Sequence, residues 1–299
     1  MIEPNHFPTI FDGVWWAFVT GSTVGYGDYV PLSLYGKFIG ILLILSGGGL
    51  VTFYMANLSI GTVKHEQDLS EGKVPFKGSN HTIIVGWNER TKALVNTLQT
   101  YNTQQDIVII DKTLQNIMYR ENSFHFIRGE ATTDHVLGKA NIQQAEKIII
   151  TSDPNIDEAN VDRQTILTTL AARGNNPSLL IISEILVESQ RENALRAGAD
   201  VIIQSNELMS SLFFQTIRHP EIPVANIINE ALKEFEFYTD KAPVSLIGKS
   251  FDDCAHTLLD QRIWLIGLIR NGKNIYSPEP NNIIEKEDEL IFFRLTEKK

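Results

Sequence analysis

The chain has 299 residues, a formal net charge of −10 at pH 7 and an isoelectric point near 5.2. This acidic balance excludes the broad basic surface that nucleic-acid-binding proteins need, so we expect no nucleic-acid partner. The sequence has a single cysteine, Cys254, so an internal disulfide is excluded, as is typical of proteins in a reducing compartment. We expect the Cys254 thiol to be a small buried side chain and not a reactive group. We expect no enzyme activity, because the seven histidines lack metal-ligand spacing and the sequence has neither a phosphate-binding loop nor a nucleophile motif.

The first predicted elements are a short helix and the loop that follows it. Residues 11–20 are dense in aromatic side chains and predict a helix that is too short to cross a bilayer. The next segment contains the pentapeptide Thr23-Val24-Gly25-Tyr26-Gly27. Its two glycines permit backbone angles that other residues avoid, so that consecutive carbonyl groups can point in one direction. The pentapeptide matches the known potassium-filter motif, in which carbonyl oxygens of four such loops replace the water shell of the ion.

A long apolar segment follows the pentapeptide. Residues 38–58 are nearly free of charge and reach the length of about 20 residues that a membrane-spanning helix needs. Gly47, Gly48 and Gly49 lie in its middle and weaken the helix locally, because each glycine costs up to about 1 kcal/mol relative to alanine. This glycine run predicts either close packing against another membrane helix or a hinge that lets a pore open, and within the run Gly47 stands at the position that resembles the gating glycine of potassium channels. We favour the hinge.

The sequence beyond the apolar segment changes character twice. Residues 61–79 are polar and predict a linker whose first part can continue the preceding helix. From His81 onward, short apolar runs alternate with segments of helical pattern. Continuous apolar strands separated by helices indicate a parallel sheet covered on both faces, so we expect a Rossmann-like domain over residues 80–205. The predicted strands are residues 82–85, 107–110, 124–127, 147–150, 179–182 and 201–203. The predicted helices between them include one that Asn88 caps, residues 157–173 and residues 188–197.

The last third of the chain predicts a smaller module. Residues 206–218 indicate one more helix of the preceding domain. Residues 226–237 predict a second helix, and residues 263–269 and 290–293 predict two strands. This mixture indicates a small α+β domain at the C-terminal end.

The whole chain resembles prokaryotic potassium channels that carry a cytosolic RCK domain, a regulator of potassium conductance. The segments IGLIRNGK and EKEDELIFF extend the likeness to the C-terminal, or TrkA-C, part of RCK domains. The resemblance implies a pore helix, a selectivity filter and an inner transmembrane helix in residues 1–60, and a linker in residues 61–79. It further implies a Rossmann-like N-terminal RCK domain in residues 80–219 and an α+β C-terminal RCK domain in residues 220–299.

The resemblance also implies an assembly and a location. The subunits would form a homotetramer through the pore, with paired RCK domains and a lipid bilayer around the pore helices. The complete subunit would be a multi-pass protein of the plasma membrane with its RCK domain in the cytoplasm. Subunits of this family carry an outer membrane helix before the pore helix, whereas only Met1 to Pro8 precede it here. We therefore expect that the sequence begins late relative to the family.

The loop after the first predicted strand bears on nucleotide binding. A Rossmann fingerprint needs three spaced glycines there, and residues 86–91, which read GWNERT, keep only the first. Asn88 restricts the approach of a pyrophosphate and Glu89 adds a negative charge, so we do not expect NAD. Gly86 and Asp111 stay candidate contacts for an adenine nucleotide that binds without the usual glycine fingerprint. Capping of a turn would explain an aspartate at position 111 equally well.

A divalent cation is the other candidate regulatory ligand. Calcium needs several oxygen ligands on one surface. In calcium-gated members of the family, one aspartate follows a strand and two glutamates lie two residues apart after a later strand. The matching positions here are Thr151, Glu184 and Leu186, of which only Glu184 keeps an acidic side chain. Glu184 is therefore the one candidate metal ligand at that site.

The leading hypothesis is a potassium-selective channel subunit that is gated by ligand binding to a cytosolic RCK ring. Potassium ions would be the permeant species, and the ring would pull on the inner helices. A regulatory RCK subunit of a separate potassium transporter is the alternative, although such a protein needs neither a filter nor a spanning helix. An NAD-dependent oxidoreductase is a third hypothesis, against which the incomplete glycine fingerprint and the missing catalytic groups argue.

Overall fold

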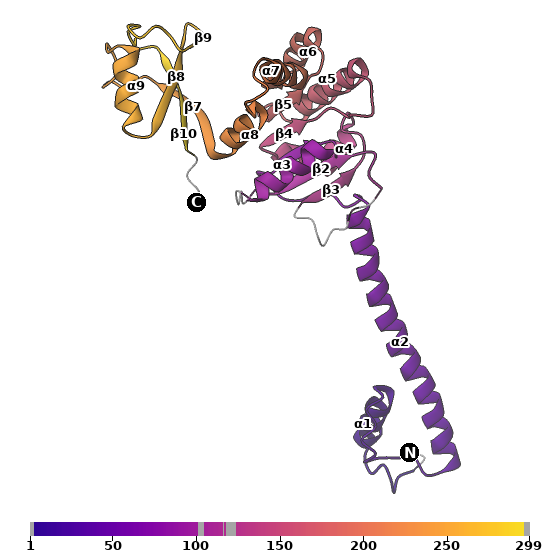
Figure 1. The fold of residues 1–299 in the computed structure, drawn as a ribbon. Coiled ribbons are helices and arrows are strands. Elements are labelled where there is room, and N and C mark those ends of the chain that lie inside the picture. Colours follow the sequence, from indigo (N-terminus) through magenta and orange to yellow (C-terminus); the bar gives the residue numbers. More distant parts are fainter. Residues whose placement is uncertain (1–2, 101–104, 116, 118–123, 296–299) are drawn as a thin grey trace. The chain divides into compact units, whose positions relative to one another are not determined.

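The computed structural model describes residues 3–100, 105–115, 117 and 124–295 (Figure 1). The chain separates into two compact units. The first comprises residues 1–96, 104–184 and 189–202. It holds a parallel sheet and the segment up to Ser70, called the pore segment below. The second comprises residues 97–103, 185–188 and 203–299, and its described residues hold three whole helices and an antiparallel sheet.

The pore segment begins with helix α1 (Ile10–Gly21), which confirms the short helix predicted there. A capping box starts this helix: Asp12 N donates to Thr9 Oγ1 at 3.2 Å and Thr9 N donates to Asp12 Oδ2 at 2.8 Å. The loop that carries the pentapeptide follows. Helix α2 (Leu34–Ser70) then begins, and Ser33 Oγ caps it by accepting from Gly36 N at 3.0 Å.

Helix α2 has 37 residues and is therefore about 55 Å long, well above the roughly 30 Å of a bilayer's hydrocarbon core. Among the described residues it is the one helix with the length and apolar composition to cross a membrane. The helix continues unbroken to Ser70, so the segment predicted as a linker is helical over residues 61–70. Lysine, glutamate and glutamine favour helix there, and the first proline comes only at Pro75.

The segment after α2 is fixed to the parallel-sheet domain by backbone hydrogen bonds. Arg128 N donates to Gly72 O at 2.9 Å, and Phe76 N donates to Lys139 O at 2.8 Å. The Phe76 ring lies between two histidine rings, 4.6 Å from His81 and 5.4 Å from His125 between centroids. The end of α2 is therefore bonded closely to the sheet domain.

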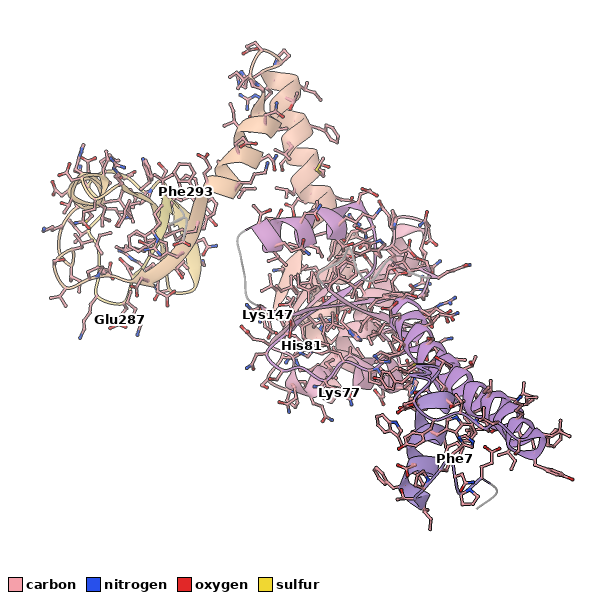
Figure 2. All side chains as sticks on the ribbon, turned by 90° about the horizontal axis from the view of Figure 1, so that it is seen from below. Phe7, Lys77, His81, Lys147, Glu287 and Phe293 are labelled. Atoms are coloured by element: carbon pink, nitrogen blue, oxygen red, sulfur yellow. The ribbon has the colours of Figure 1, made fainter. Side chains whose placement is uncertain are left out.

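The first unit is built on six parallel strands in the order β3-β2-β1-β4-β5-β6. Strand β1 pairs in parallel with both β2 and β4, which is the strand order of a doubly wound Rossmann-like fold and confirms that prediction. Thr82 of β1 is in register with Lys147 of β4, and Figure 2 labels Lys147 and His81, the residue just before β1. The strands are β1 (Thr82–Val85), β2 (Ile107–Asp111), β3 (His125–Arg128), β4 (Lys147–Ile150), β5 (Leu180–Glu184) and β6 (Val201–Ile203).

Helices cover this sheet, and the core combines buried strand residues with apolar residues of the helices and loops packed on them. Ile83, Val108, Ile148 and Ile181 are fully buried at the centre of their strands, as the apolar runs predicted. The helices are α3 (Glu89–Thr100), α4 (Asp134–Lys139), α5 (Glu158–Asn175) and α6 (Arg191–Arg196). The helix predicted over residues 188–197 is a 3₁₀ turn (Glu188–Gln190) followed by the short α6. Helix α4 was not predicted.

The second unit starts with α7 (Ser205–Arg218) and α8 (Val224–Glu234). The helix predicted over residues 226–237 is wrong at its end, because the chain becomes strand β7 (Phe235–Lys241). Aromatic residues at alternate positions favour a strand, and β7 pairs antiparallel with the last strand from Phe235 to Lys241. Tertiary pairing thus overrides the helical pattern of the preceding residues.

A four-stranded antiparallel sheet in the order β7-β10-β8-β9 completes this unit, which confirms its α+β character. The remaining strands are β8 (Ile263–Arg270), β9 (Lys273–Tyr276) and β10 (Glu289–Leu295), and helix α9 (Phe251–Leu259) packs on the sheet. Cys254, Leu268 and Leu290 form the centre of this second core. Phe293 lies in the same sheet (Figure 2). Strands β7 and β9 and helix α9 were not predicted.

Candidate functional site

The last turn of α1 holds the inner end of the filter loop. Val24 N and Gly25 N both donate to Val19 O at 3.2 Å, and Thr23 N donates to Thr20 O at 3.1 Å. Val19 is the buried residue of the helix. The pore helix therefore fixes the backbone at the beginning of the pentapeptide before any side chain contributes.

The pentapeptide alternates in the sign of φ. Thr23, Gly25 and Gly27 have φ of 63°, 60° and 76°, whereas Val24 and Tyr26 are not among the residues with positive φ. Glycine adopts such angles readily, but a residue with a Cβ pays strain energy, so Thr23 is held there by its surroundings. The N–H groups of Thr23, Val24 and Gly25 all bond to carbonyl oxygens of α1 and therefore lie on the helix side of the loop. This is the backbone geometry that a ring of cation-binding carbonyl groups requires.

The outer end of the loop is tied back to the middle of α1. Trp15 Nε1 donates to Asp28 Oδ2 at 2.7 Å, and Tyr29 N donates to Asp28 Oδ1 at 3.0 Å. The Trp15 and Tyr26 rings stack with centroids 6.1 Å apart and an interplanar angle of 5°. Neither Trp15 nor Asp28 was predicted from the sequence to support the filter. The only feature of the sequence that could have indicated this contact is a tryptophan before the pentapeptide and an aspartate directly after it.

Gly47, the predicted hinge, lies against the end of the pore helix. A Cβ placed on Gly47 would lie 2.9 Å from the Cα of Gly21. At Gly48 and Gly49, a Cβ would meet no heavy atom of the described residues within 4 Å. The close packing that the glycine run allowed therefore applies at Gly47, and its role as a hinge stays a prediction.

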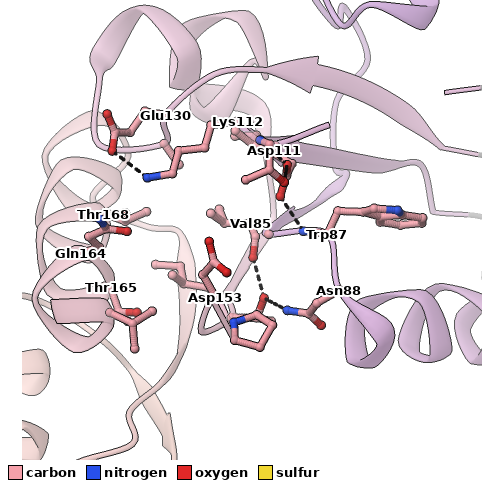
Figure 3. A pocket seen from close by; sticks show the side chains of 18 of the residues that line it. Val85, Trp87, Asn88, Asp111, Lys112, Glu130, Asp153, Gln164, Thr165 and Thr168 are labelled. Atoms are coloured by element: carbon pink, nitrogen blue, oxygen red, sulfur yellow. Dashed lines mark hydrogen bonds and ion pairs between the residues drawn. The ribbon is translucent and has the colours of Figure 1, made fainter. Parts of the chain in front are cut away.

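A crevice of about 320 Å³ opens at the carboxyl ends of β1, β2 and β4 (Figure 3). Ligands of doubly wound sheets bind at this point, where neighbouring strands lead away in opposite directions. Gly86 and Asp111 both line it, so the structure brings the two candidate nucleotide contacts together. An ion pair between Lys112 Nζ and Glu130 Oε1, 3.3 Å apart, crosses one wall.

The candidate contacts Gly86 and Asp111 have structural tasks in this crevice. Gly86 has φ of 95°, and a Cβ there would lie 2.7 Å from Thr151 Oγ1. Asp111 is only 8% exposed, and its Oδ2 accepts from Trp87 N at 2.8 Å. Its Oδ1 accepts from Thr113 N at 2.7 Å. The structure thus gives Asp111 the turn-cap role, and ribose binding by this residue stays a prediction.

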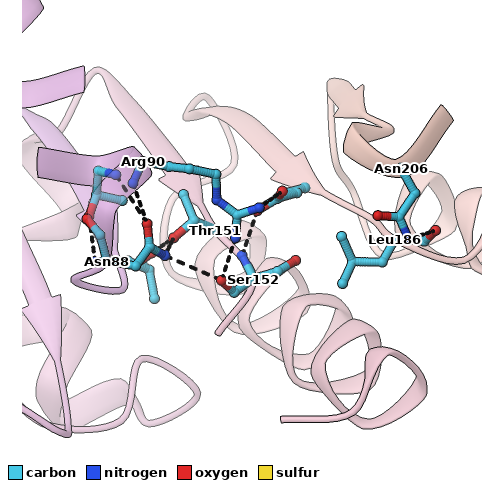
Figure 4. Close-up of polar contacts among 9 residues, drawn as sticks. Asn88, Arg90, Thr151, Ser152, Leu186 and Asn206 are labelled. Carbon is cyan, nitrogen blue, oxygen red and sulfur yellow. Dashed lines mark hydrogen bonds and ion pairs between the residues drawn. The ribbon is translucent and has the colours of Figure 1, made fainter. Parts of the chain in front are cut away.

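Asn88 caps helix α3, as predicted (Figure 4). Its Oδ1 accepts from Arg90 N at 3.0 Å and from Thr91 N at 3.1 Å, and its Nδ2 donates to Thr151 Oγ1 at 3.3 Å. Backbone N–H groups at this helix start are those that a dinucleotide's pyrophosphate contacts in Rossmann folds. Because the Asn88 side chain already uses two of them, the site is poorly suited to NAD.

The candidate metal ligand Glu184 is 7% exposed and already paired. Its Oε1 lies 2.7 Å from Arg90 Nη1, and its Oε2 accepts from Ser152 N at 2.7 Å. Across the described part of the chain, no group of three or more His, Cys, Asp and Glu side chains is placed to hold a metal ion. Leu186 belongs to the second unit, where its carbonyl oxygen accepts from Asn206 Nδ2 at 3.2 Å (Figure 4). A cation bound by Glu184 stays a prediction that this geometry does not favour.

Two family models match the chain. The "Ion channel" family matches residues 2–63, and the "TrkA-N domain" family matches residues 82–205. The GsuK channel has a similar fold with a TM-score of 0.51 at 18% identity. That alignment covers 96% of this chain and 51% of the solved chain, so this chain spans about half the length of that structure.

Two microbial proteins are similar over almost the whole sequence. YugO of Bacillus subtilis, which is named as a potassium channel protein, is 37% identical over 294 residues, covering 97% of this chain and 89% of YugO. TvoK of Thermoplasma volcanium, named as a calcium-gated potassium channel, is 30% identical over 305 residues, covering 99% of this chain and 85% of TvoK. Together with the filter loop, the spanning helix and the parallel sheet, these similarities show that the chain belongs to the prokaryotic potassium channels with an RCK domain.

Proposed function

We propose that this chain forms a homotetramer in which the filter loops line one potassium-conducting pore, and that a ligand bound to the RCK domains opens it. The alternation of positive and negative φ over residues 23–27 is the observation that carries the proposal. Rings of carbonyl oxygens from the loops replace the hydration shell of potassium, and the Thr23 hydroxyl groups add a further ring at the inner end. Gly47 is the point at which the inner helix bends.

The proposal places the subunit in the plasma membrane as a multi-pass protein with the RCK domain in the cytoplasm. Helix α2 is longer than a bilayer's hydrocarbon core, and its charged residues after Lys64 lie beyond the apolar part. The segment after Ser70 is bound to β3 through Gly72 and Arg128, which supports transmission of force from the sheet to the pore. The antiparallel sheet with α9 supports a C-terminal RCK domain that pairs with a neighbouring copy.

The crevice above β1, β2 and β4 is the proposed site of the regulatory ligand. TvoK is named as calcium-gated, but Glu184 of this chain is already bound by Arg90 and by the Ser152 amide. The crevice carries both Lys112 and Glu130 on its wall, which suits a polar organic molecule such as an adenine nucleotide better than a bare cation. The ligand opens the channel if it binds the open arrangement of the ring more tightly than the closed one.

Potassium uptake by proteoliposomes that contain the full-length protein, measured with ATP and with calcium on the RCK side, tests the proposal. We expect uptake down a potassium gradient and a clear loss in Gly25→Ala, because an added Cβ disfavours the positive φ at this position. Gly13→Ala in α1 is the matched control, since Gly13 does not have a positive φ and an added Cβ there meets no described atom within 4 Å. Absence of potassium uptake by the wild-type protein, or full uptake by Gly25→Ala, contradicts the proposal.

A further inference from the structure

The end of the pore helix meets the inner helix at Gly21 and Gly47, where the atoms nearest to the position of a Gly47 Cβ are all backbone atoms of Gly21. Gly21 is the last residue of α1, and Gly47 lies near the middle of the apolar part of α2. A Cβ on Gly47 would approach the Cα, O and C atoms of Gly21 to 2.9, 3.5 and 3.6 Å. These are backbone atoms, which cannot turn aside as the end of a flexible side chain can. No side chain therefore lies between Gly21 and Gly47.

The space for an added Cβ differs between the two sides of the contact, and it differs between Gly47 and the two glycines that follow it. A Cβ on Gly21 would lie 4.0 Å from the Gly47 Cα, an ordinary van der Waals distance. Alanine thus fits at Gly21 and clashes at Gly47 in the present arrangement. Gly48 and Gly49 have open space around them within the described residues. The three glycines should have similar effects on helix propensity, so only the contact distinguishes them.

Gly21 is joined to the filter by a rigid turn. The carbonyl groups of Val19 and Thr20, just before Gly21, accept the N–H groups of Thr23, Val24 and Gly25. A push on the backbone at Gly21 consequently moves the residues that form the inner end of the filter. Close-packed backbone transmits such a displacement, because it has no free volume in which to absorb it.

We infer that Gly21 is a positioning residue that seats the pore helix directly on the inner helix at Gly47, so that movement of α2 at this point shifts the inner end of the filter. The inference rests on the proposed function, since it concerns how a potassium pore couples its two parts. It gives Gly47 a second role in addition to any flexibility that it gives the helix. A glycine is needed at this position because only a residue without a Cβ can pack against the backbone of Gly21.

A double-mutant cycle on the ratio of open to closed channels tests the contact. Single-channel recordings of the full-length protein compare Gly21→Ala, Gly47→Ala and the double variant with wild type. We expect the double variant to depart from the product of the single effects by about threefold or more, as contacting positions do. The matched cycle of Gly21→Ala with Gly48→Ala should be additive. Additivity in both cycles, or equal coupling in both, overturns the inference.

A size series at Gly21 gives a second readout that does not depend on assembly of the Gly47 variant. The potassium-to-sodium permeability ratio should stay near the wild-type value with alanine at Gly21, because its Cβ lies at an ordinary van der Waals distance from the Gly47 Cα, and should fall with valine, whose added methyl groups press against the Gly47 backbone. The same series at Gly13, which contacts no described atom in this way, should leave the ratio unchanged. A flat series at Gly21 overturns the inference even while wild-type channels conduct, whereas wild-type protein without potassium flux overturns the proposed function itself.

Discussion

Trp15 Nε1 and Asp28 Oδ2 form a 2.7 Å hydrogen bond that links the middle of the pore helix to the residue just after the filter. The Trp15 ring also stacks on Tyr26 within the filter. With the bonds from Val19 O at the inner end, both ends of the loop are therefore held by the same helix. This bracing fixes the strained backbone angles between the two ends.

Replacing Trp15 with phenylalanine keeps an aromatic ring beside Tyr26 but removes the hydrogen-bond donor. This bond is made to a charged carboxylate and is stronger than a bond between neutral groups, so we expect its loss to lower the population of the ordered filter relative to distorted forms. Sustained potassium current per channel, measured in planar bilayers, should fall accordingly. Trp16→Phe is the matched control, because the Trp16 ring packs edge-on against Phe7 and is not the residue that bonds Asp28. Equal currents from the two variants would exclude the bracing role of Trp15.

The buried pair of Arg270 and Asp288 should be the main polar support of the C-terminal sheet. Asp288 is 1% exposed and accepts from Arg270 Nε at 2.7 Å, Arg270 Nη2 at 2.6 Å and Glu285 N at 2.7 Å. Asp288→Asn should cost about 3 kcal/mol of local unfolding free energy, at the lower end for buried pairs because Arg270 keeps its contact with Glu285. Hydrogen exchange should accelerate in β8 and β10, and much less in the exposed control Asp240→Asn. Unchanged exchange in Asp288→Asn would contradict this role.

The pair of Arg270 and Asp288 should also make the stability of the C-terminal sheet depend on pH. Burial alone would raise the pKa of Asp288, but the hydrogen bonds from Arg270 and Glu285 N and the Arg270 charge outweigh it and lower this pKa. The stabilisation is therefore fully present above the unfolded-state pKa of about 3.9 and is lost as the pH falls through the lower folded-state pKa. Hydrogen exchange of β8 and β10 should stay slow down to about pH 4 in the wild-type protein. Acceleration that begins near neutral pH would contradict this assignment.

His81 should make the parallel-sheet domain sensitive to acid at a higher pH. This side chain is fully buried, its Nε2 donates to Ala140 O at 2.8 Å, and burial lowers its pKa. Because the neutral form is favoured in the fold, its contribution is complete above the unfolded-state pKa of about 6.5 and is lost as the pH falls through the lower folded-state pKa. His81→Gln should flatten the decline of melting temperature below pH 6.5, whereas the exposed control His256→Gln should keep it. Identical pH profiles for wild type and His81→Gln would rule this out.

Cys254 should be inert in the folded protein. It is fully buried, its Sγ contacts Leu246 O at 3.6 Å, and burial raises its pKa, so little thiolate forms. Iodoacetamide should leave the native protein unlabelled by mass spectrometry and should label one site after denaturation. The variant Lys286→Cys, in an exposed turn, should gain one native label and serves as the positive control. Rapid native labelling of Cys254 would contradict its position in the core.

Local patterns predicted the features that depend on neighbours in the sequence. Strand β1 and the filter loop follow from short runs of residues whose types restrict the backbone directly. Contacts between distant positions could not be predicted this way. The bond of Arg90 to Glu184 joins residues 94 positions apart, and the contact of Gly21 with Gly47 depends on how two helices cross. Strand β7 was missed because only its pairing with β10 turns that segment away from a helix.

The measurement that tests the central claim most directly is the reversal potential of the full-length protein with potassium on one side of a bilayer and sodium on the other. Converging filter loops predict a potential close to that of a membrane permeable to potassium alone, and a shift toward zero in Tyr26→Ala, which removes the ring stacked on Trp15. A wild-type potential near zero, or selectivity unchanged by Tyr26→Ala, would contradict the account.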